Sequence, residues 1–191
     1  MNIFIPLAAL CALLLMAKPA EAARRTHAQV LKDARPADVD LAAHRWSSVF
    51  DVPVAWIRSQ AYAESQNIPT ATNPRTDARG VLQILPTTAA WLVTSLLKSK
   101  WKNHKRVIRT LKTKWRGNSD DLYDVELNVM LATYYMNILT KQFGKIHEFV
   151  AAAYNAGPGK VARLLSAGQP LPKESLTYLA MVADAKSRGF M

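Results

Sequence analysis

Residues 61–89 read AYAESQNIPTATNPRTDARGVLQILPTTA, and this stretch decides the local fold. Glu64 stands near the end of an apolar, helix-like run, and the Pro-, Asn- and Thr-rich residues 66–79 follow it. Such a composition is typical of a long surface loop. Gly80 then opens an apolar segment that Pro86 closes. The pattern therefore predicts a helix, a loop and a second helix, with a lone carboxylate where the first helix ends.

Glu64 is placed unusually for a surface carboxylate. On a helix expected over residues 54–65, it falls with Ile57 and Ala61 at i, i+4 and i+7, so the three share a face that favours burial. Burial would raise the pKa of the carboxyl group. The alternative is a surface Glu at a helix end, but a negative charge there is mildly unfavourable. The placement therefore favours a functional role.

Apolar periodicity predicts helices along most of the chain, and no run with period-two alternation predicts a strand. Asp51 is a candidate N-cap before Pro53, and Asp120 or Asp121 is a candidate start for a long helix that Gly144 ends. We therefore expect one all-α globular domain. The remaining expected helices cover residues 36–50, 87–97, 107–111, 123–143, 146–155, 160–166 and 174–186.

The first 22 residues resemble an export signal. Ile3 to Ala17 is nearly unbroken apolar sequence, and it is followed by Ala20-Glu21-Ala22. These features predict a cleaved signal peptide over 1–22 and a periplasmic location, with an uncleaved membrane anchor as the alternative. We expect a polar lead-in over 23–35 and the folded domain over 36–191.

The chain offers no evident ligand set for a metal. Its only cysteine, Cys11, lies in the expected signal peptide, so the mature protein would have no disulfide or catalytic thiol. The four histidines include no pair at metal-binding spacing, and they are His27, His44, His104 and His147. We therefore expect no metal and no cofactor.

Positive charge is concentrated between Asp77 and Asp120. The formal net charge is +11, and this interval contains no Asp or Glu. Such a segment attracts polyanions, namely cell-wall polymer, anionic lipid or nucleic acid. We favour a solvated face over a nucleic-acid module. Steep salt dependence of DNA binding would reveal such a module. The basic residues are Lys98, Lys100, Lys102, Lys105, Arg106, Arg109, Lys112, Lys114 and Arg116.

Four motifs occur in a fixed order. They are Glu64-Ser65 with Pro69, then Gly80-Val81-Leu82-Gln83-Ile84-Leu85-Pro86-x-Thr88-Ala89, then Ala153-Tyr154-Asn155-Ala156-Gly157, then Glu174-Ser175-x-x-Tyr178-Leu179. This order, over about residues 36–185, resembles the soluble lytic transglycosylase family with its goose-type-lysozyme-like fold. Asp124, Asn128 and Tyr135 also match the Asp, Asn and Tyr of that family's central helix.

The resemblance implies an activity and a set of roles. The family cleaves the bond between N-acetylmuramic acid and N-acetylglucosamine in peptidoglycan glycan strands, with a 1,6-anhydro product. Glu64 would act first as acid and then as base, and Glu174 would be structural or would position substrate. The implied substrate-binding residues are Ser65, Gln83, Tyr154, Asn155 and Tyr178.

The sequence also departs from the family pattern, and other functions stay open. Residues 66–69 read Gln-Asn-Ile-Pro where an aromatic residue and Asn usually precede the Pro, and the basic insertion over about 98–119 is longer than the usual link. One alternative is a lysozyme-like hydrolase, and another is a non-catalytic wall-binding scaffold. Small members of this family that open the wall locally often accompany secretion, conjugation or pilus machinery. The resemblance therefore implies components of such machinery as possible partners. We expect no nucleic-acid partner, and membrane contact only through an uncleaved N-terminal segment or the basic patch.

Overall fold

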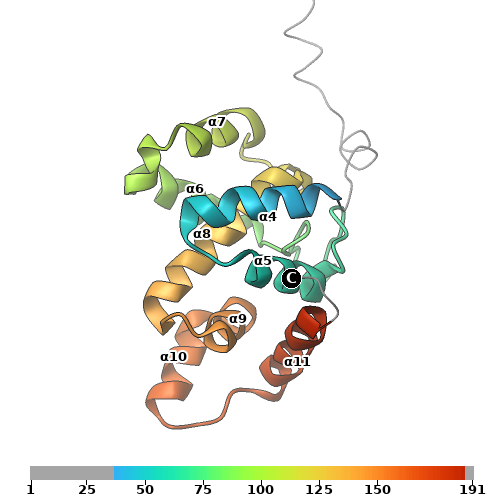
Figure 1. Cartoon of the computed structure of the whole chain (residues 1–191), viewed down its shortest axis with the longest axis vertical. Helices are drawn as coiled ribbons and strands as arrows, with labels where there is room; N and C mark the ends of the chain where they lie inside the picture. Colours follow the sequence, from blue (N-terminus) through green and yellow to red (C-terminus); the bar gives the residue numbers. More distant parts are fainter. Residues whose placement is uncertain (1–36, 188–191) are drawn as a thin grey trace, which may run out of the picture. The chain divides into compact units, whose positions relative to one another are not determined.

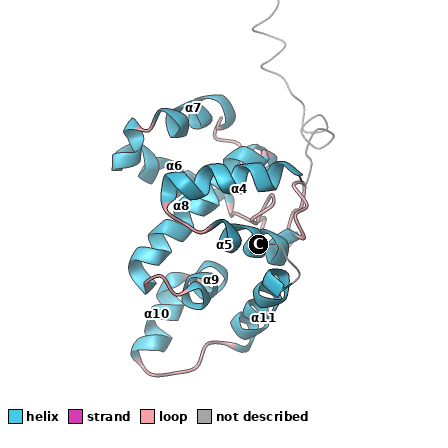
Figure 2. Cartoon of the chain, in the orientation of Figure 1, coloured by secondary structure: helices cyan, strands magenta, loops and turns pink. Residues whose placement is uncertain are grey.

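The computed structural model describes residues 37–187, which belong to one structural unit. This part is helical, with loops between the helices (Figures 1 and 2), and its only β-type pairing consists of the isolated bridges Thr72–Arg79 and Arg79–Ile84. The expected all-α architecture is confirmed. In the numbering of Figure 1, the elements are α4 (Ala37–Phe50), α5 (Val54–Ser65), α6 (Pro86–Lys98), the 3₁₀ helix η1 (Lys100–Asn103), α7 (Lys105–Lys114), η2 (Ser119–Tyr123), α8 (Val125–Phe143), α9 (His147–Ala156), α10 (Pro158–Ser166) and α11 (Lys173–Ser187).

Helix α8 forms the centre of the hydrophobic core. It is buried on nearly every side, as expected for a helix without a continuous polar face. Helix α4 packs across it (Figure 1), and Trp46 and Phe50 on α4 are fully buried. The Phe50 ring lies 5.4 Å from the ring of Tyr134 on α8. Because burying one large apolar side chain contributes about 1.5–3 kcal/mol, this contact fixes α4 against α8.

A second group of helices carries the residues of three of the four motifs. Helix α11 packs against α5 and α9, and α10 packs against α9. Ala151 on α9 and Tyr178 on α11 are buried together in a small apolar cluster. Residues far apart in the sequence, on α5, α9 and α11, are thereby brought together.

The loop between α5 and α6 is fixed from α8 by one buried side chain. The Asn128 Oδ1 accepts a hydrogen bond from the Leu82 backbone N–H at 2.9 Å. Its Nδ2 donates to the carbonyl oxygens of Arg79 and Leu122, each at 2.9 Å. Gly80 packs so closely here, at φ +78°, that a Cβ atom would lie 2.2 Å from the Leu122 oxygen. The loop is therefore shaped by α8.

Most predicted helices are confirmed to within a few residues, but two predicted starts are wrong. Asp51 is not an N-cap: it has φ +54°, forms an ion pair with Lys145, and leaves Pro53 at the N-cap position. The long helix begins at Val125 and not at Asp120 or Asp121, because the Asp124 side chain caps it by accepting from the Leu127 N–H at 3.1 Å.

The predictions for the N-terminus fall outside the described residues. These are the signal peptide over 1–22 and the polar lead-in over 23–35. Among the helices within 37–187, none is both long enough and apolar enough to cross a membrane.

Candidate active site

Glu64 lies in the last turn of α5, where the chain turns sharply into the loop. Gln66 caps this helix in the left-handed conformation, at φ 55°. The Tyr178 hydroxyl on α11 donates a hydrogen bond to Glu64 Oε1 at 2.9 Å. That hydroxyl in turn accepts from Gln60 Nε2 at 3.3 Å. The carboxylate is therefore oriented by a short chain of buried donors that links α5 to α11.

The pKa of Glu64 suits proton transfer in both directions. Burial raises the pKa of this carboxyl group from 4.5 to about 7, and the Tyr178 hydrogen bond opposes the rise. Burial, rather than the charge of a second carboxylate, causes the shift. A carboxyl group with a pKa near neutrality can act as a general acid and then, once deprotonated, as a general base.

Tyr154 on α9 is a second tyrosine close to Glu64. Its hydroxyl donates to the Leu82 carbonyl oxygen at 2.8 Å, which joins α9 to the loop. Burial is the main reason that the pKa of Tyr154 lies well above 10. The charge of Glu64 is the next cause, which indicates that the two groups are close. The Tyr135 ring lies 5.3 Å from the Tyr154 ring, and the Trp91 ring lies 6.1 Å from Tyr135. Three aromatic rings thus run outward from the site.

Ser65 and Gln83 hold the loop in place with their side-chain donors. Ser65 Oγ donates to the Val81 carbonyl oxygen at 2.8 Å. Gln83 Nε2 donates to the carbonyl oxygens of Gly80 at 2.8 Å and Ala71 at 3.1 Å. The structure thus places these two residues in the framework next to Glu64, and direct sugar contact by either stays a prediction.

Asn155 and Glu174 lie on exposed surface. Asn155, next to Tyr154 on α9, is exposed. Glu174 is exposed one turn before Tyr178 on α11, and it forms an ion pair with Lys160 at 2.6 Å. The pair joins α10 to α11 near the tyrosine that orients Glu64. The structural or substrate-positioning role of Glu174 and sugar contact by Asn155 both stay predictions.

Comparison with known proteins identifies the family. The Transglycosylase SLT domain matches residues 42–176. The chain belongs to this family.

Several relatives of this SLT domain are soluble lytic transglycosylases. The chain is 27% identical over 149 residues to the soluble lytic murein transglycosylase of Escherichia coli K12, a match that covers 77% of this chain and 20% of that protein. The corresponding protein of Salmonella typhimurium is 26% identical over 149 residues. The chain therefore spans about a fifth of the length of these relatives.

Solved structures support the same fold. The crystal structure of the 70 kDa soluble lytic transglycosylase from Escherichia coli superposes with a TM-score of 0.61 at 27% identity, covering 76% of this chain and 23% of that one. A complex of the 70 kDa enzyme with bulgecin A gives a TM-score of 0.59 at 26% identity. The predicted lysozyme-like SLT fold is thereby confirmed.

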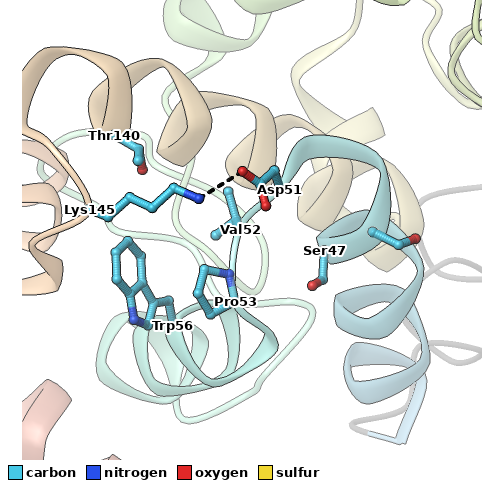
Figure 3. Close-up of a pocket in the computed structure, with 8 residues that line it drawn as sticks. Ser47, Asp51, Val52, Pro53, Trp56, Thr140 and Lys145 are labelled. Atoms are coloured by element: carbon cyan, nitrogen blue, oxygen red, sulfur yellow. Dashed lines mark hydrogen bonds and ion pairs between the residues drawn. The ribbon is translucent and has the colours of Figure 1, made fainter.

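A separate pocket of this SLT domain lies at the turn between α4 and α5. It has a volume of about 350 Å³, and Figure 3 shows the Lys145 ammonium group pointing toward the Asp51 carboxylate beside Trp56. None of the predicted site residues lines it. Trp56 is stacked on His147 with ring centroids 4.6 Å apart, and burial lowers the pKa of that histidine to about 4. The candidate active site is defined by Glu64 and its partners, not by this pocket.

Two residues near the site were not predicted from the sequence. Gln60 lies one turn before Glu64 on α5, and this spacing together with its polarity inside an apolar helix could have indicated it. Trp91 on α6 is 50% exposed yet touches the aromatic row. No sequence pattern distinguished it from the other tryptophans.

Proposed function

We propose that the protein is a peptidoglycan lytic transglycosylase that cleaves the β-1,4 bond between N-acetylmuramic acid and N-acetylglucosamine. The proposal depends above all on Glu64, a carboxyl group with a pKa of about 7 that Tyr178 orients. The relatives named soluble lytic murein transglycosylase support the same substrate class.

The proposed reaction uses Glu64 twice. The protonated carboxyl first donates its proton to the glycosidic oxygen, and the bond from that oxygen to C1 of the muramyl residue breaks. The resulting carboxylate then accepts the proton of the muramyl 6-hydroxyl. At the same time the oxygen of that hydroxyl bonds to C1, which gives the 1,6-anhydro product. The nucleophile is intramolecular, so its effective concentration is high and no second carboxylate is required.

A lysozyme-like hydrolase is the main alternative. Glycosidases that use water or a covalent intermediate commonly place a second carboxylate close to the acid. Within residues 37–187, no such negative charge contributes to the shift in Glu64 pKa, and Glu174 is exposed and paired with Lys160. These contacts favour the transglycosylase. The intact hydrogen-bond chain to Glu64 similarly favours an enzyme over a non-catalytic scaffold.

Digestion of purified sacculi followed by mass spectrometry of the products tests the proposal. We expect anhydro-muropeptides from the wild type and none from Glu64→Gln. Glu174→Gln is the matched control, because it removes the other motif carboxylate from an exposed position. We expect it to retain measurable anhydro product. Reducing-end products would establish the hydrolase, and full activity of Glu64→Gln would remove Glu64 from the mechanism.

The proposed substrate places the protein in the cell envelope, where it would open the wall locally, for instance for a secretion, conjugation or pilus machine.

Because a 70 kDa relative forms a complex with bulgecin A, we also expect this compound to bind here. Calorimetric titration of the protein with bulgecin A checks this expectation, and Tyr154→Ala should weaken the binding.

A further inference from the structure

The basic segment that begins at the end of α6 carries many exposed cationic side chains. Its central element, α7, lies at one end of the described unit, with α10 and α11 at the other end (Figure 1). Lys114 is turned toward α8 and forms an ion pair with Asp124 at 2.6 Å. The remaining eight basic side chains are all exposed, and we call them the α7 basic surface: Lys98, Lys100, Lys102, Lys105, Arg106, Arg109, Lys112 and Arg116.

Helix α7 is amphipathic, and its two faces have different tasks. Val107 and Leu111 are buried and attach the helix to the core. Lys105, Arg109 and Lys112, at i, i+4 and i+7, share the opposite face and are exposed. The fold therefore needs the apolar face but gains nothing evident from the cations.

The positive charge of this surface is not balanced within the described protein. None of the ion pairs among residues 37–187 involves the eight side chains of the α7 basic surface. Clustered like charges repel one another, so the arrangement costs stability unless an anion compensates it. The surface is complementary to an extended array of negative charge.

The two tryptophans of the segment are partly buried and pack against the core. The Trp101 ring meets Phe50 edge-on at 5.3 Å, and the Lys100 ammonium lies 4.8 Å from the Trp101 ring centroid. Trp115 packs against the core. Single-stranded nucleic acids are commonly bound through open aromatic faces, and the contacts of both tryptophans with the core disfavour that mode here. Leu97, which is 50% exposed beside Lys98, instead offers an apolar contact suited to lipid.

We propose that the α7 basic surface binds the anionic phospholipid surface of a membrane. Lysine and arginine side chains near such a surface contribute additively, about fivefold each in affinity, and the contribution falls with ionic strength. The binding is peripheral, since the apolar face of α7 stays in the core. This role is independent of the chemistry at Glu64.

Vesicle sedimentation with the full chain tests the proposal. The probes are mixed phosphatidylcholine–phosphatidylglycerol vesicles and pure phosphatidylcholine vesicles. The test variant carries Lys105→Gln, Arg109→Gln and Lys112→Gln. The matched control carries Lys141→Gln, Arg163→Gln and Lys173→Gln, three exposed basic residues outside the surface. Both variants lose the same charge and keep the same N-terminal segment, and thermal unfolding verifies that both are folded.

We expect the wild type to prefer the anionic vesicles, and added salt to weaken that preference. The test variant should bind anionic vesicles about 100-fold more weakly, and the control variant no more than about fivefold more weakly. Equal losses in the two variants would mean that net charge alone drives binding and would overturn the proposal. An unchanged test variant would do the same, as would a selective loss of single-stranded DNA or sacculus binding with vesicle binding retained.

Discussion

Tyr178 opposes, through one hydrogen bond, the rise in Glu64 pKa that burial causes, so its replacement has a predictable sign. The bond lowers the pKa of the carboxyl group, so Tyr178→Phe should raise that pKa from its present value of about 7. The acid form needed for the first step then persists to higher pH. In pH–activity profiles on sacculi, we expect the alkaline decline to move up by about one pH unit, with lower activity at the optimum. Tyr134→Phe is the control, because its hydroxyl is bonded to Ser95 and its profile should match the wild type.

Glu64 should also cost the protein stability at high pH. Its pKa is raised from 4.5 to about 7 on folding, so the folded state binds the proton more tightly than the unfolded chain. The cost is absent below pH 4.5, grows up to about pH 7 and is full above it. It amounts to about 2 kcal/mol, less than the full shift implies because part of the side chain remains exposed.

Glu64→Gln removes this cost and keeps an acceptor for Tyr178. We therefore expect the variant to melt several degrees above the wild type at pH 8 and at nearly the same temperature at pH 4. Calorimetry at the two pH values measures the difference. A lower melting temperature at pH 8 would contradict the burial of the charge.

At the scale of elements, local patterns predicted the helices well but their starts less reliably. Val39, Ala42 and Trp46 recur at helical spacing, and the structure buries all three on α4. The start of α8 was misplaced because η2 carries its own capping box, in which Asn118 and Asp121 bond reciprocally. Asp120, Asp121 and Asp124 each satisfy the rule for an N-cap, and only the folded structure shows that Asp124 caps α8.

Asn128 couples α8 to the loop, and its loss should affect the fold and the site together. Asn128→Ala removes the side-chain partner of the buried Leu82 N–H and of the Leu122 carbonyl. The Arg79 carbonyl also loses a bond but still accepts from the Ile84 N–H at 3.1 Å. Because buried groups without partners cost about 1–3 kcal/mol each, we expect a loss of about 3 kcal/mol or more in denaturant unfolding. Activity should fall too, since the Leu82 carbonyl holds Tyr154.

Asn137→Ala provides the comparison on the same helix. This buried side chain donates one hydrogen bond, to the Phe50 carbonyl oxygen at 2.6 Å, and it does not bond to the loop. We expect a smaller loss of about 1 kcal/mol and little change in activity per folded molecule. Equal effects of the two substitutions would show that Asn128 has no special link to the site.

At the scale of the whole molecule, the sequence predicts which residues lie near Glu64 better than it predicts their roles. The ordered motifs led to Glu64, Tyr154 and Tyr178, and the packing of α5, α9 and α11 brings these together. The bonds of Ser65 and Gln83 to backbone oxygens could not be predicted, because they depend on the loop path that Asn128 imposes. Long-range contacts such as that between Gln60 and Tyr178 leave only weak local signals.

The aromatic row from Tyr154 through Tyr135 to Trp91 extends the site across α9, α8 and α6. Trp91 is half exposed and offers a ring for a sugar outside the cleaved pair. Under the proposed function, Trp91→Ala should lower kcat/KM on long glycan strands about tenfold, because a lost stacking contact of about 1–1.5 kcal/mol acts only where a distal sugar is present. Turnover of a short oligosaccharide should hardly change. Leu41→Ala on α4, which removes an exposed apolar side chain elsewhere, should leave both rates unaltered. If Trp91→Ala slows the short and long substrates equally, the row supports the fold of the site and does not bind the strand.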